Sequence, residues 1–330
     1  MSFFAVLFAL LIEQFKPLPR ANLVHETLSA WMRWAGRNFD AGRDHHAWVV
    51  WSITVIAPAL LAWGIHFGID RFSLILALLW NVAVLYLTLG FRQFSHYFTD
   101  IRDALDRGDE VEARRLLAQW REIDTSELPR TELLRHVIEH SLLAAHRHVF
   151  GVFFWFVLLS SFGLGPAGAV LYRMAEFASR YWAFRSRTID AQVNTRLTDL
   201  SQRLFNALDY IPARLTAFGF AVVGNFEEAV TCWRRDAGLW KFPNEGIILS
   251  AAAGAVGVRL GGALPVAIMS RQGTSFAAAG APPEAVDADG STPGVLPELG
   301  HLRSVVGLVW RSVVLWMLLL ALLSLANLVG

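Results

Sequence analysis

The segment from His136 to His140 reads HVIEH and places a glutamate directly before its second histidine. Histidines four residues apart share one face of a helix and can both bind zinc, while a neighbouring glutamate can serve as a base. The spacing matches the inverted zincin pattern H-x-x-E-H. A catalytic zinc needs a third protein ligand, and the nearest candidates, His146 and His148, fall on the same predicted helix. Zinc binding by His136 and His140 is therefore the alternative to a solvated polar helix face that carries Glu139.

A second candidate for chemistry is the arginine-rich segment 173–210. Guanidinium groups pair bidentately with phosphate or carboxylate. Leucines spaced by three or four residues from Leu197 to Leu208 predict an amphipathic helix in this segment. Two interpretations stay open: the helix lies on anionic lipid headgroups, or its arginines bind an anionic small molecule. The arginines concerned are Arg173, Arg180, Arg185, Arg187, Arg196 and Arg203.

A glycine pattern stands at residues 163–168, which read GLGPAG and formally match the dinucleotide-binding pattern G-x-G-x-x-G. The pattern lies inside a long apolar run rather than after a strand, and Pro166 occupies the turn, so nucleotide binding is not indicated. Glycine and proline both weaken a helix. We therefore predict a break between Val149–Phe162 and Pro166–Trp182, and the two arms either span the membrane or re-enter it.

The elements that must position these groups are uncharged apolar runs of membrane length. A helix of about 20 apolar residues crosses about 30 Å of hydrocarbon. Only Asp70 and Arg71 separate the first two runs, which predicts a tight helical hairpin. We predict an all-α fold, a polytopic helical integral membrane protein with cytoplasmic amphipathic helices. The four runs are Trp48–Ile69, Phe72–Phe91, Val149–Tyr172 and Ser312–Val329.

The composition of the 330-residue chain agrees with this class. Hydrophobic residues make up 55% and charged residues 17%, against about 25% charged residues in soluble globular proteins. The net charge of +1 provides no basic field for nucleic acid. The lone Cys232 excludes a disulfide within the chain. We expect a lipid bilayer as the main partner and no nucleic acid, and the oligomeric state stays open.

The sidedness of the polar segments follows from their arginines. Segments 13–47, 92–148 and 173–210 are all rich in arginine, and the positive-inside tendency places all three in the cytoplasm. That arrangement requires the run Val149–Tyr172 to return to the same side, or the short apolar segment Ser2–Ile12 not to cross.

Along the chain we predict five consecutive segments. Residues 1–91 hold N-terminal membrane helices and the hairpin, and residues 92–148 form a polar helical insert. Residues 149–269 form a core with the broken membrane helix, the arginine-rich amphipathic helix and a glycine-rich segment. Residues 270–304 read as a loop because they carry turn residues without apolar periodicity. Residues 305–330 form the C-terminal membrane helix.

Three stretches resemble a known family. Residues 209–217 read DYIPARLTA and resemble the NWIPARLTA segment of the CobD/CbiB family of cobalamin-biosynthesis membrane proteins. Residues 242–246 read FPNEG and residues 253–262 read AGAVGVRLGG, similar to that family's SPNAG and AGALGVRLGG stretches. The order of the elements also agrees. The resemblance extends over roughly residues 90–265 and is most specific in residues 209–262.

The resemblance implies an adenosylcobinamide-phosphate synthase. Such an enzyme joins aminopropanol or its O-phosphate to a propionate of adenosylcobyric acid as an amide, and ATP and Mg²⁺ are the cofactors that this activity requires. It implies a corrinoid or other anionic small molecule as partner and the bacterial inner (plasma) membrane as location. Pro212 is expected to break the helix just before Arg214. The residues implied as ligand contacts are Arg214, Asn244, Arg259, Asp209, Asp124 and Thr125, and those implied as catalytic are Glu139 and Glu176.

The departures from the family pattern concern its acidic residues. In the family motif ESxxENxxDG only the first Glu remains, as Glu139, and Leu143, Ala144 and Arg147 replace the second Glu, the Asn and the Asp. Missing acids remove electrostatic support for phosphoryl transfer. The sequence therefore also resembles the divergent AmpE branch, and a non-catalytic membrane signalling or regulatory protein is the alternative function.

Overall fold

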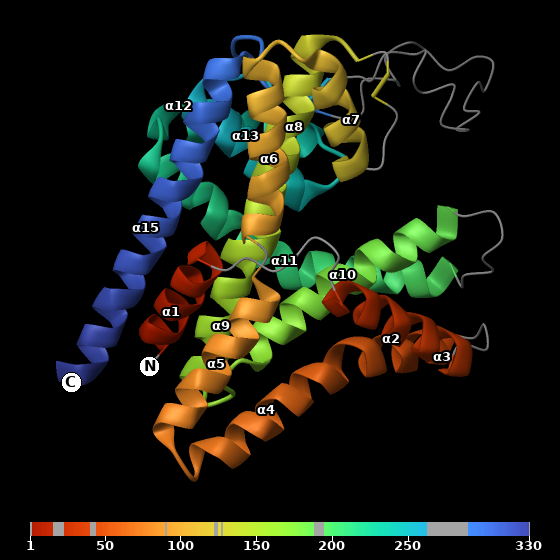
Figure 1. The fold of residues 1–330 in the computed structure, drawn as a ribbon, viewed down its shortest axis with the longest axis vertical. Helices are drawn as coiled ribbons and strands as arrows, with labels where there is room; N and C mark the ends of the chain where they lie inside the picture. The colour runs from red at the N-terminus through yellow and green to blue at the C-terminus, as the bar shows by residue number, and fades with distance from the viewer. Residues whose placement is uncertain are drawn as a thin grey trace. The chain divides into compact units, whose positions relative to one another are not determined.

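The computed structural model describes residues 2–15, 23–39, 44–89, 91–121, 125–126, 128–187, 195–262 and 290–329 (Figure 1). In these ranges every regular element is a helix, and only isolated β-bridges, Val258 with Val295 and Gly261 with Ser291, pair extended backbone. The prediction of an all-α membrane protein is confirmed. The helices are α1 (Ser2–Phe15), α2 (Leu23–Phe39), α3 (Asp44–Trp51), η1 (Ser52–Ile56), α4 (Ala57–Asp70), α5 (Leu74–Thr88), α6 (Phe91–Asp106), α7 (Glu110–Arg121), α8 (Arg130–Ala145), η2 (His146–Phe150), α9 (Gly151–Ser161), α10 (Ala167–Arg187), α11 (Thr195–Val223), α12 (Phe226–Asp236), η3 (Ala237–Leu239), α13 (Pro243–Val256) and α15 (Leu299–Val329).

The chain forms two compact units, each assembled from segments that are distant in sequence. Unit 1 comprises residues 1–93, 146–212 and 317–330, and unit 2 comprises residues 94–145 and 213–316. Helices α6, α8, α11 and α15 contain or border the four points at which the chain passes from one unit to the other. Helix α15 begins at Leu299, earlier than the predicted boundary at residue 305.

Three helical stretches in the described part of the chain are long and apolar enough to cross a membrane: His45–Asp70, Arg130–Ser161 and Leu299–Ala326. The shorter helices α1 and α5 are also apolar. The second stretch joins α8, η2 and α9, so the uncharged run Val149–Tyr172 does not form a helix of its own. The first part of this run continues a helix that begins in the polar insert, at Arg130.

The predicted hairpin is present in unit 1. Helices α4 and α5 meet at a tight turn from Arg71 to Ser73, which is visible at the lower end of α4 in Figure 1. The Ser73 hydroxyl accepts a hydrogen bond from the backbone N–H of Leu76 and caps α5. Farther along the hairpin, the indole N–H of Trp80 donates to the carbonyl of Ala62 at 3.2 Å.

The predicted helix break is also present, between α9 and α10. Gly163 and Gly165 have φ values of +75° and +55°, which only glycine adopts readily. The two arms pack closely, because a Cβ on Gly151 would collide with the ring of Tyr172 and one on Gly168 with the carbonyl of Trp155. Contacts 151 with 172 and 155 with 168 define an antiparallel helical hairpin.

Helix α11 corrects one expectation, because Pro212 lies inside a continuous helix and does not break it. A proline lacks the N–H that would bond the carbonyl four residues earlier, here that of Leu208. The indole N–H of Trp155, on α9, donates to that same carbonyl at 3.1 Å. The freed acceptor is thus satisfied by a tertiary contact, which lets the helix continue through Pro212.

Candidate functional site

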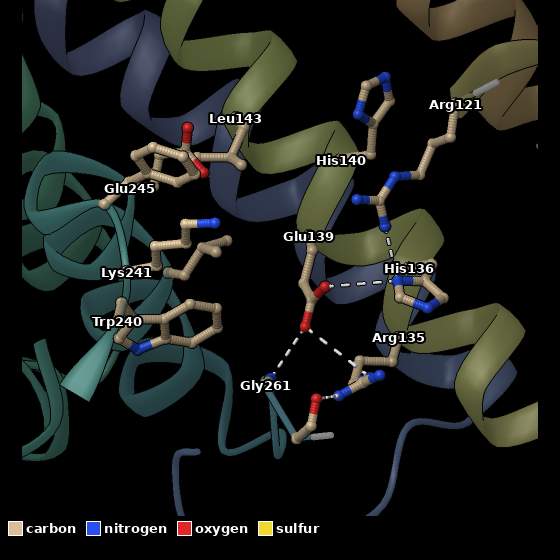
Figure 2. A pocket seen from close by; sticks show the side chains of 13 residues that line it. Arg121, Arg135, His136, Glu139, His140, Leu143, Trp240, Lys241, Glu245 and Gly261 are labelled. Carbon is tan, nitrogen blue, oxygen red and sulfur yellow. Dashed lines mark hydrogen bonds and ion pairs between the residues drawn. The ribbon is translucent and has the colours of Figure 1, made fainter. Parts of the chain in front are cut away.

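Unit 2 contains a cavity of about 210 Å³ between α8, the turn that precedes α13, and the segment after α13 (Figure 2). All of its lining residues belong to the same unit. Figure 2 shows Trp240, Lys241 and Glu245 on one side and Glu139, His136 and Arg135 on the other. The lining residues are Arg121, Arg135, His136, Glu139, His140, Leu143, Trp240, Lys241, Phe242, Glu245, Leu249, Gly261 and Gly262.

Glu139 is held at the edge of the cavity by groups from two parts of the chain. Its Oε1 atom accepts a hydrogen bond from the backbone N–H of Gly261 at 2.8 Å and lies 3.9 Å from Nε of Arg135. Its Oε2 atom lies 3.6 Å from Nδ1 of His136. Residues 135, 136 and 139 share one face of α8 because helical neighbours are three and four residues apart.

The glycines opposite Glu139 allow this approach. Gly261 has a φ of +78°, and a Cβ there would collide with the carbonyl of Gly290. The same segment is anchored by Leu260, whose N–H donates to Oγ1 of Thr292 at 2.8 Å. The carbonyl of Gly262 accepts from Nη1 of Arg135 at 3.0 Å. The glycine-rich segment therefore presents one N–H and one carbonyl to α8.

His136 contacts an arginine of α7. Nη1 of Arg121 lies 2.6 Å from Nδ1 of His136. Because a guanidinium carries only donors, this contact occupies the lone pair of Nδ1. A zinc ion would compete with Arg121 for that atom. Within the ranges described, no group of three or more His, Cys, Asp or Glu side chains is placed to hold a metal ion. The ring of His140 instead packs edge-on against Trp120, with 4.4 Å between centroids.

The charges around the cavity are mixed. Arg121, Arg135 and Lys241 are cations, and Glu139 and Glu245 are carboxylates. Arg135 is committed within the protein, because it pairs with Glu132 and bonds Gly262. Lys241 is exposed, with Nζ 5.7 Å from the centroid of the Phe242 ring. The arrangement suits a small ligand that carries an anionic group, which Arg121 and Lys241 can contact.

Arg214 and Asn244 are brought together in unit 2, where they pair α11 with the start of α13. Nη1 of Arg214 donates to Oδ1 of Asn244 at 3.4 Å. Asn244 is buried in the first turn of α13. Pro243 begins this helix, at a position where a backbone N–H would find no acceptor within the helix, so the missing N–H of proline is tolerated there. Neither residue lines the cavity.

The other expected ligand contacts lie away from the cavity. The side chain of Arg259 is exposed, and its backbone N–H donates to the carbonyl of Val295 at 2.8 Å. Thr125 is buried and donates its hydroxyl to the carbonyl of Arg114, in the first half of α7, at 2.8 Å. Asp124 lies outside the described residues.

Glu176 belongs to unit 1, where it is 1% exposed on α10. Its Oε2 atom accepts from Nη1 of Arg173 at 2.7 Å, and Arg180 pairs with its other oxygen. Burial raises the pKa of the Glu176 carboxyl, but the neighbouring charges of Arg180 and Arg173 lower it by more. The pKa therefore lies below its ordinary value. Glu176 is part of a buried ion-pair network.

Asp209 also belongs to unit 1 and is buried on α11. Its Oδ1 atom lies 2.7 Å from Nε2 of His146 and accepts from the hydroxyl of Tyr172 at 2.7 Å. These contacts join α11 to η2 and α10. Asp209 thus connects helices of unit 1 and does not line the cavity of unit 2.

Among the cavity residues that sequence reasoning missed are Arg121, Trp240, Lys241 and Glu245. Glu245 lies inside the FPNEG stretch and Lys241 immediately before it, so proximity to that stretch was the available signal. Arg121 offered none, because it is one of several charged residues on an amphipathic helix.

The model of the family "CobD/Cbib protein" matches residues 3–272. A protein of Stutzerimonas stutzeri (strain A1501), named "Cobalamin biosynthesis protein CobD", is 32% identical over 287 residues, which cover 86% of this chain and 84% of that protein.

Two further relatives have the same name. That of Chromobacterium violaceum is 35% identical over 209 residues, covering 63% of this chain and 62% of the relative. That of Leptospira interrogans serovar copenhageni is 26% identical over 222 residues, 65% of each chain. No solved structure matches. None of these findings favours the AmpE-like alternative. The family model over nearly the whole chain and the first relative together show that this chain belongs to the CobD/CbiB family.

Proposed function

We propose that this membrane protein acts in cobalamin biosynthesis as an amide-forming synthase whose small amine substrate binds in the unit 2 cavity. The observation that carries the proposal is the position of Glu139. It is the one residue retained from the family's acidic motif, and it lines a cavity with Arg121 and Lys241. The names of the relatives support the pathway, and the family resemblance supports the reaction.

The size of the cavity favours the small substrate. Pockets for drug-sized ligands span roughly 300–1,000 Å³, and this cavity has about 210 Å³. Aminopropanol, its O-phosphate or one propionate arm is of the right scale, whereas a corrin ring is not. Arg121 and Lys241 would contact the phosphate or carboxylate, and Glu245 would contact the ammonium group.

Activation of a carboxylate by ATP calls for Mg²⁺, which proteins usually hold through one or two carboxylates together with substrate phosphates. Two carboxylates, Glu139 and Glu245, line the cavity, so its donor set is compatible with such an ion. Glu139 already contacts Gly261, Arg135 and His136, so an ion bound to it would share its carboxylate oxygens with these groups. The bound ion would neutralise charge that develops on the transferred phosphoryl group.

The remaining expected residues divide into two groups under this proposal. Arg214, Asn244 and Arg259 stay candidates for contacts to the larger, anionic corrinoid, because they flank the cavity-forming segments in the sequence and lie in unit 2. Glu176, Asp209 and Thr125 hold the structure together through the contacts described above.

We place the protein in the bacterial inner membrane with its polar segments in the cytoplasm. The stretch Arg130–Ser161 has 32 residues, which span about 48 Å at 1.5 Å per residue, more than the roughly 30 Å of hydrocarbon. One end must therefore project beyond the hydrocarbon. The charged half, α8, carries Glu139 and is the end suited to water, where ATP is available.

Complementation tests this function. A strain that lacks the synthase is given the full chain, and growth dependent on cobalamin is followed with cobyric acid as precursor. The wild-type chain and the control variant Arg234→Gln, exposed on α12 outside the cavity, should restore growth. Lys241→Gln removes a positive charge, as the control does, but from the cavity. This variant should not restore growth, or should do so only with added aminopropanol phosphate. No rescue by the wild-type chain, at wild-type abundance in the membrane, would refute synthase activity.

A further inference from the structure

A second cavity, of about 460 Å³, lies in unit 1 and plays no part in the proposed function. It opens between α3, at the start of a candidate membrane span, and the first three turns of α11. Its lining is half apolar and half charged. The lining residues are Ala47, Trp48, Leu200, Arg196, Asp199 and Arg203.

Trp48 fixes the depth of this cavity relative to a bilayer. It lies near the beginning of the candidate span His45–Asp70, and its side chain is 52% exposed. Tryptophan concentrates at the membrane–water interface, where its ring is in apolar surroundings and its N–H can contact water or headgroups. A cavity walled by Trp48 at the end of a span therefore lies at the level of the lipid headgroups.

The charged wall of the cavity comes from α11. Arg196 and Arg203 are seven residues apart, so they lie on one face of the helix, separated by about 10.5 Å along its axis. Both are exposed, whereas Leu197 and Phe205 of the same helix are buried in the protein. Asp199 lies between the two arginines on the cavity wall, so the wall retains one net positive charge.

We propose that this cavity binds the headgroup phosphate of an anionic phospholipid. Arg196 and Arg203 contact the phosphate, and Trp48 and Leu200 contact the apolar part of the same molecule. Guanidinium groups bind phosphate through paired hydrogen bonds, and a surface that is charged along one helix and apolar along the other matches an amphipathic ligand. A free anion would use the arginines but not the apolar wall. The proposal does not rest on synthase activity.

The experiment uses the purified full chain in detergent with equal amounts of phosphatidylglycerol and phosphatidylcholine, and native mass spectrometry counts the lipids retained. Each arginine near a headgroup contributes an attraction that corresponds to about a fivefold change in binding. The variant Arg196→Gln/Arg203→Gln should therefore retain at least about fivefold less phosphatidylglycerol, with phosphatidylcholine unchanged. The matched control is Arg33→Gln/Arg37→Gln, which removes two exposed arginines of α2, in the same unit but outside the cavity.

The outcomes separate the sources of phosphate. The control variant should retain phosphatidylglycerol as the wild type does, and millimolar inorganic phosphate should not displace it. The proposal would be overturned if the cavity variant retained as much phosphatidylglycerol as the wild type, or if the control variant lost as much as the cavity variant. Displacement of the lipid by inorganic phosphate would also overturn it. Thermal unfolding is recorded for every variant. If the double variant is unfolded, Arg196→Gln and Arg203→Gln are measured singly, and retention unchanged in both would overturn the proposal equally.

Discussion

The carboxylate of Glu139 accepts a hydrogen bond from the backbone N–H of Gly261, 122 residues farther along the chain, at 2.8 Å. This contact joins the remaining residue of the family's acidic motif to the glycine-rich segment, two stretches that the sequence presents separately. Around it lie Arg121, Lys241 and Glu245, on the cavity in which we place the small substrate. The one residue left from the family's acidic motif and the glycine-rich segment that resembles the family thus meet at one site in unit 2.

The first prediction concerns Gly261. Both Gly261 and Gly257 adopt positive φ, +78° and +77°, but only a Cβ at 261 meets another atom, the carbonyl of Gly290. Gly257→Ala should therefore lower the free energy of unfolding by about 1–2 kcal/mol, the usual penalty for this backbone conformation. Gly261→Ala should show that penalty and also displace the N–H from Glu139, so synthase activity should be lost. Thermal unfolding and complementation measure both effects, and equal activity of the two variants would contradict this role of Gly261.

A second prediction concerns the continuity of α11. Trp155→Phe leaves the Leu208 carbonyl without its donor and should lower the free energy of unfolding by about 1–3 kcal/mol. In a Pro212→Ala background the same change should have a smaller effect, because the alanine N–H can bond that carbonyl. A double-mutant cycle measured by chemical unfolding gives the coupling. Additive effects of the two substitutions would show that the indole does not compensate for the proline.

The third prediction is a pH dependence at Glu176. The pKa of this carboxyl is below its ordinary value in the folded chain, so the unfolded chain binds more protons near the ordinary value of about 4.3. The stability contributed by the ionised form is present above that pH and is lost as the pH falls through the lowered pKa. Glu176→Gln should destabilise the protein at neutral pH by about 3–5 kcal/mol, because Arg173 and Arg180 lose their partner.

Unfolding midpoints recorded from pH 7 downwards test the Glu176 prediction. The wild type should lose stability faster than Glu176→Gln below about pH 5, so the two curves should converge. Parallel curves would mean that Glu176 titrates alike in the folded and unfolded chain.

The sequence predicted those features that depend on local composition. Uncharged runs of membrane length and the pair Asp70-Arg71 located the α4–α5 hairpin, and the glycines at 163 and 165 located the break before α10. The course of α11 was mispredicted because it depends on Trp155, 53 residues before the carbonyl that it bonds. Propensity assigns a proline to a helix end, and the tertiary donor that accompanies Pro212 here is not visible in the local sequence.

The candidate site was predicted in part, for a similar reason. Glu139 and Asn244 followed from residues that resemble family motifs, and both lie in unit 2. Arg121 and Lys241 carry no motif, and their place on the cavity depends on how α7, α8 and the turn before α13 pack. Glu176 and Asp209 were expected at the site because of the family resemblance, whereas the structure buries them beside Arg173, Arg180 and His146, which gives each a structural partner.

The central claim is that the unit 2 cavity carries an amide-forming synthase activity. Its most direct test is the ATP-dependent formation of adenosylcobinamide phosphate from adenosylcobyric acid and aminopropanol phosphate by the full chain reconstituted in lipid vesicles. The account predicts product with the wild type and with Arg234→Gln, and at least about a tenfold loss with Lys241→Gln, since a charged hydrogen bond contributes about 1.5–3 kcal/mol. Product formed equally by all three chains, or no product from a folded wild type supplied with ATP and Mg²⁺, would contradict it.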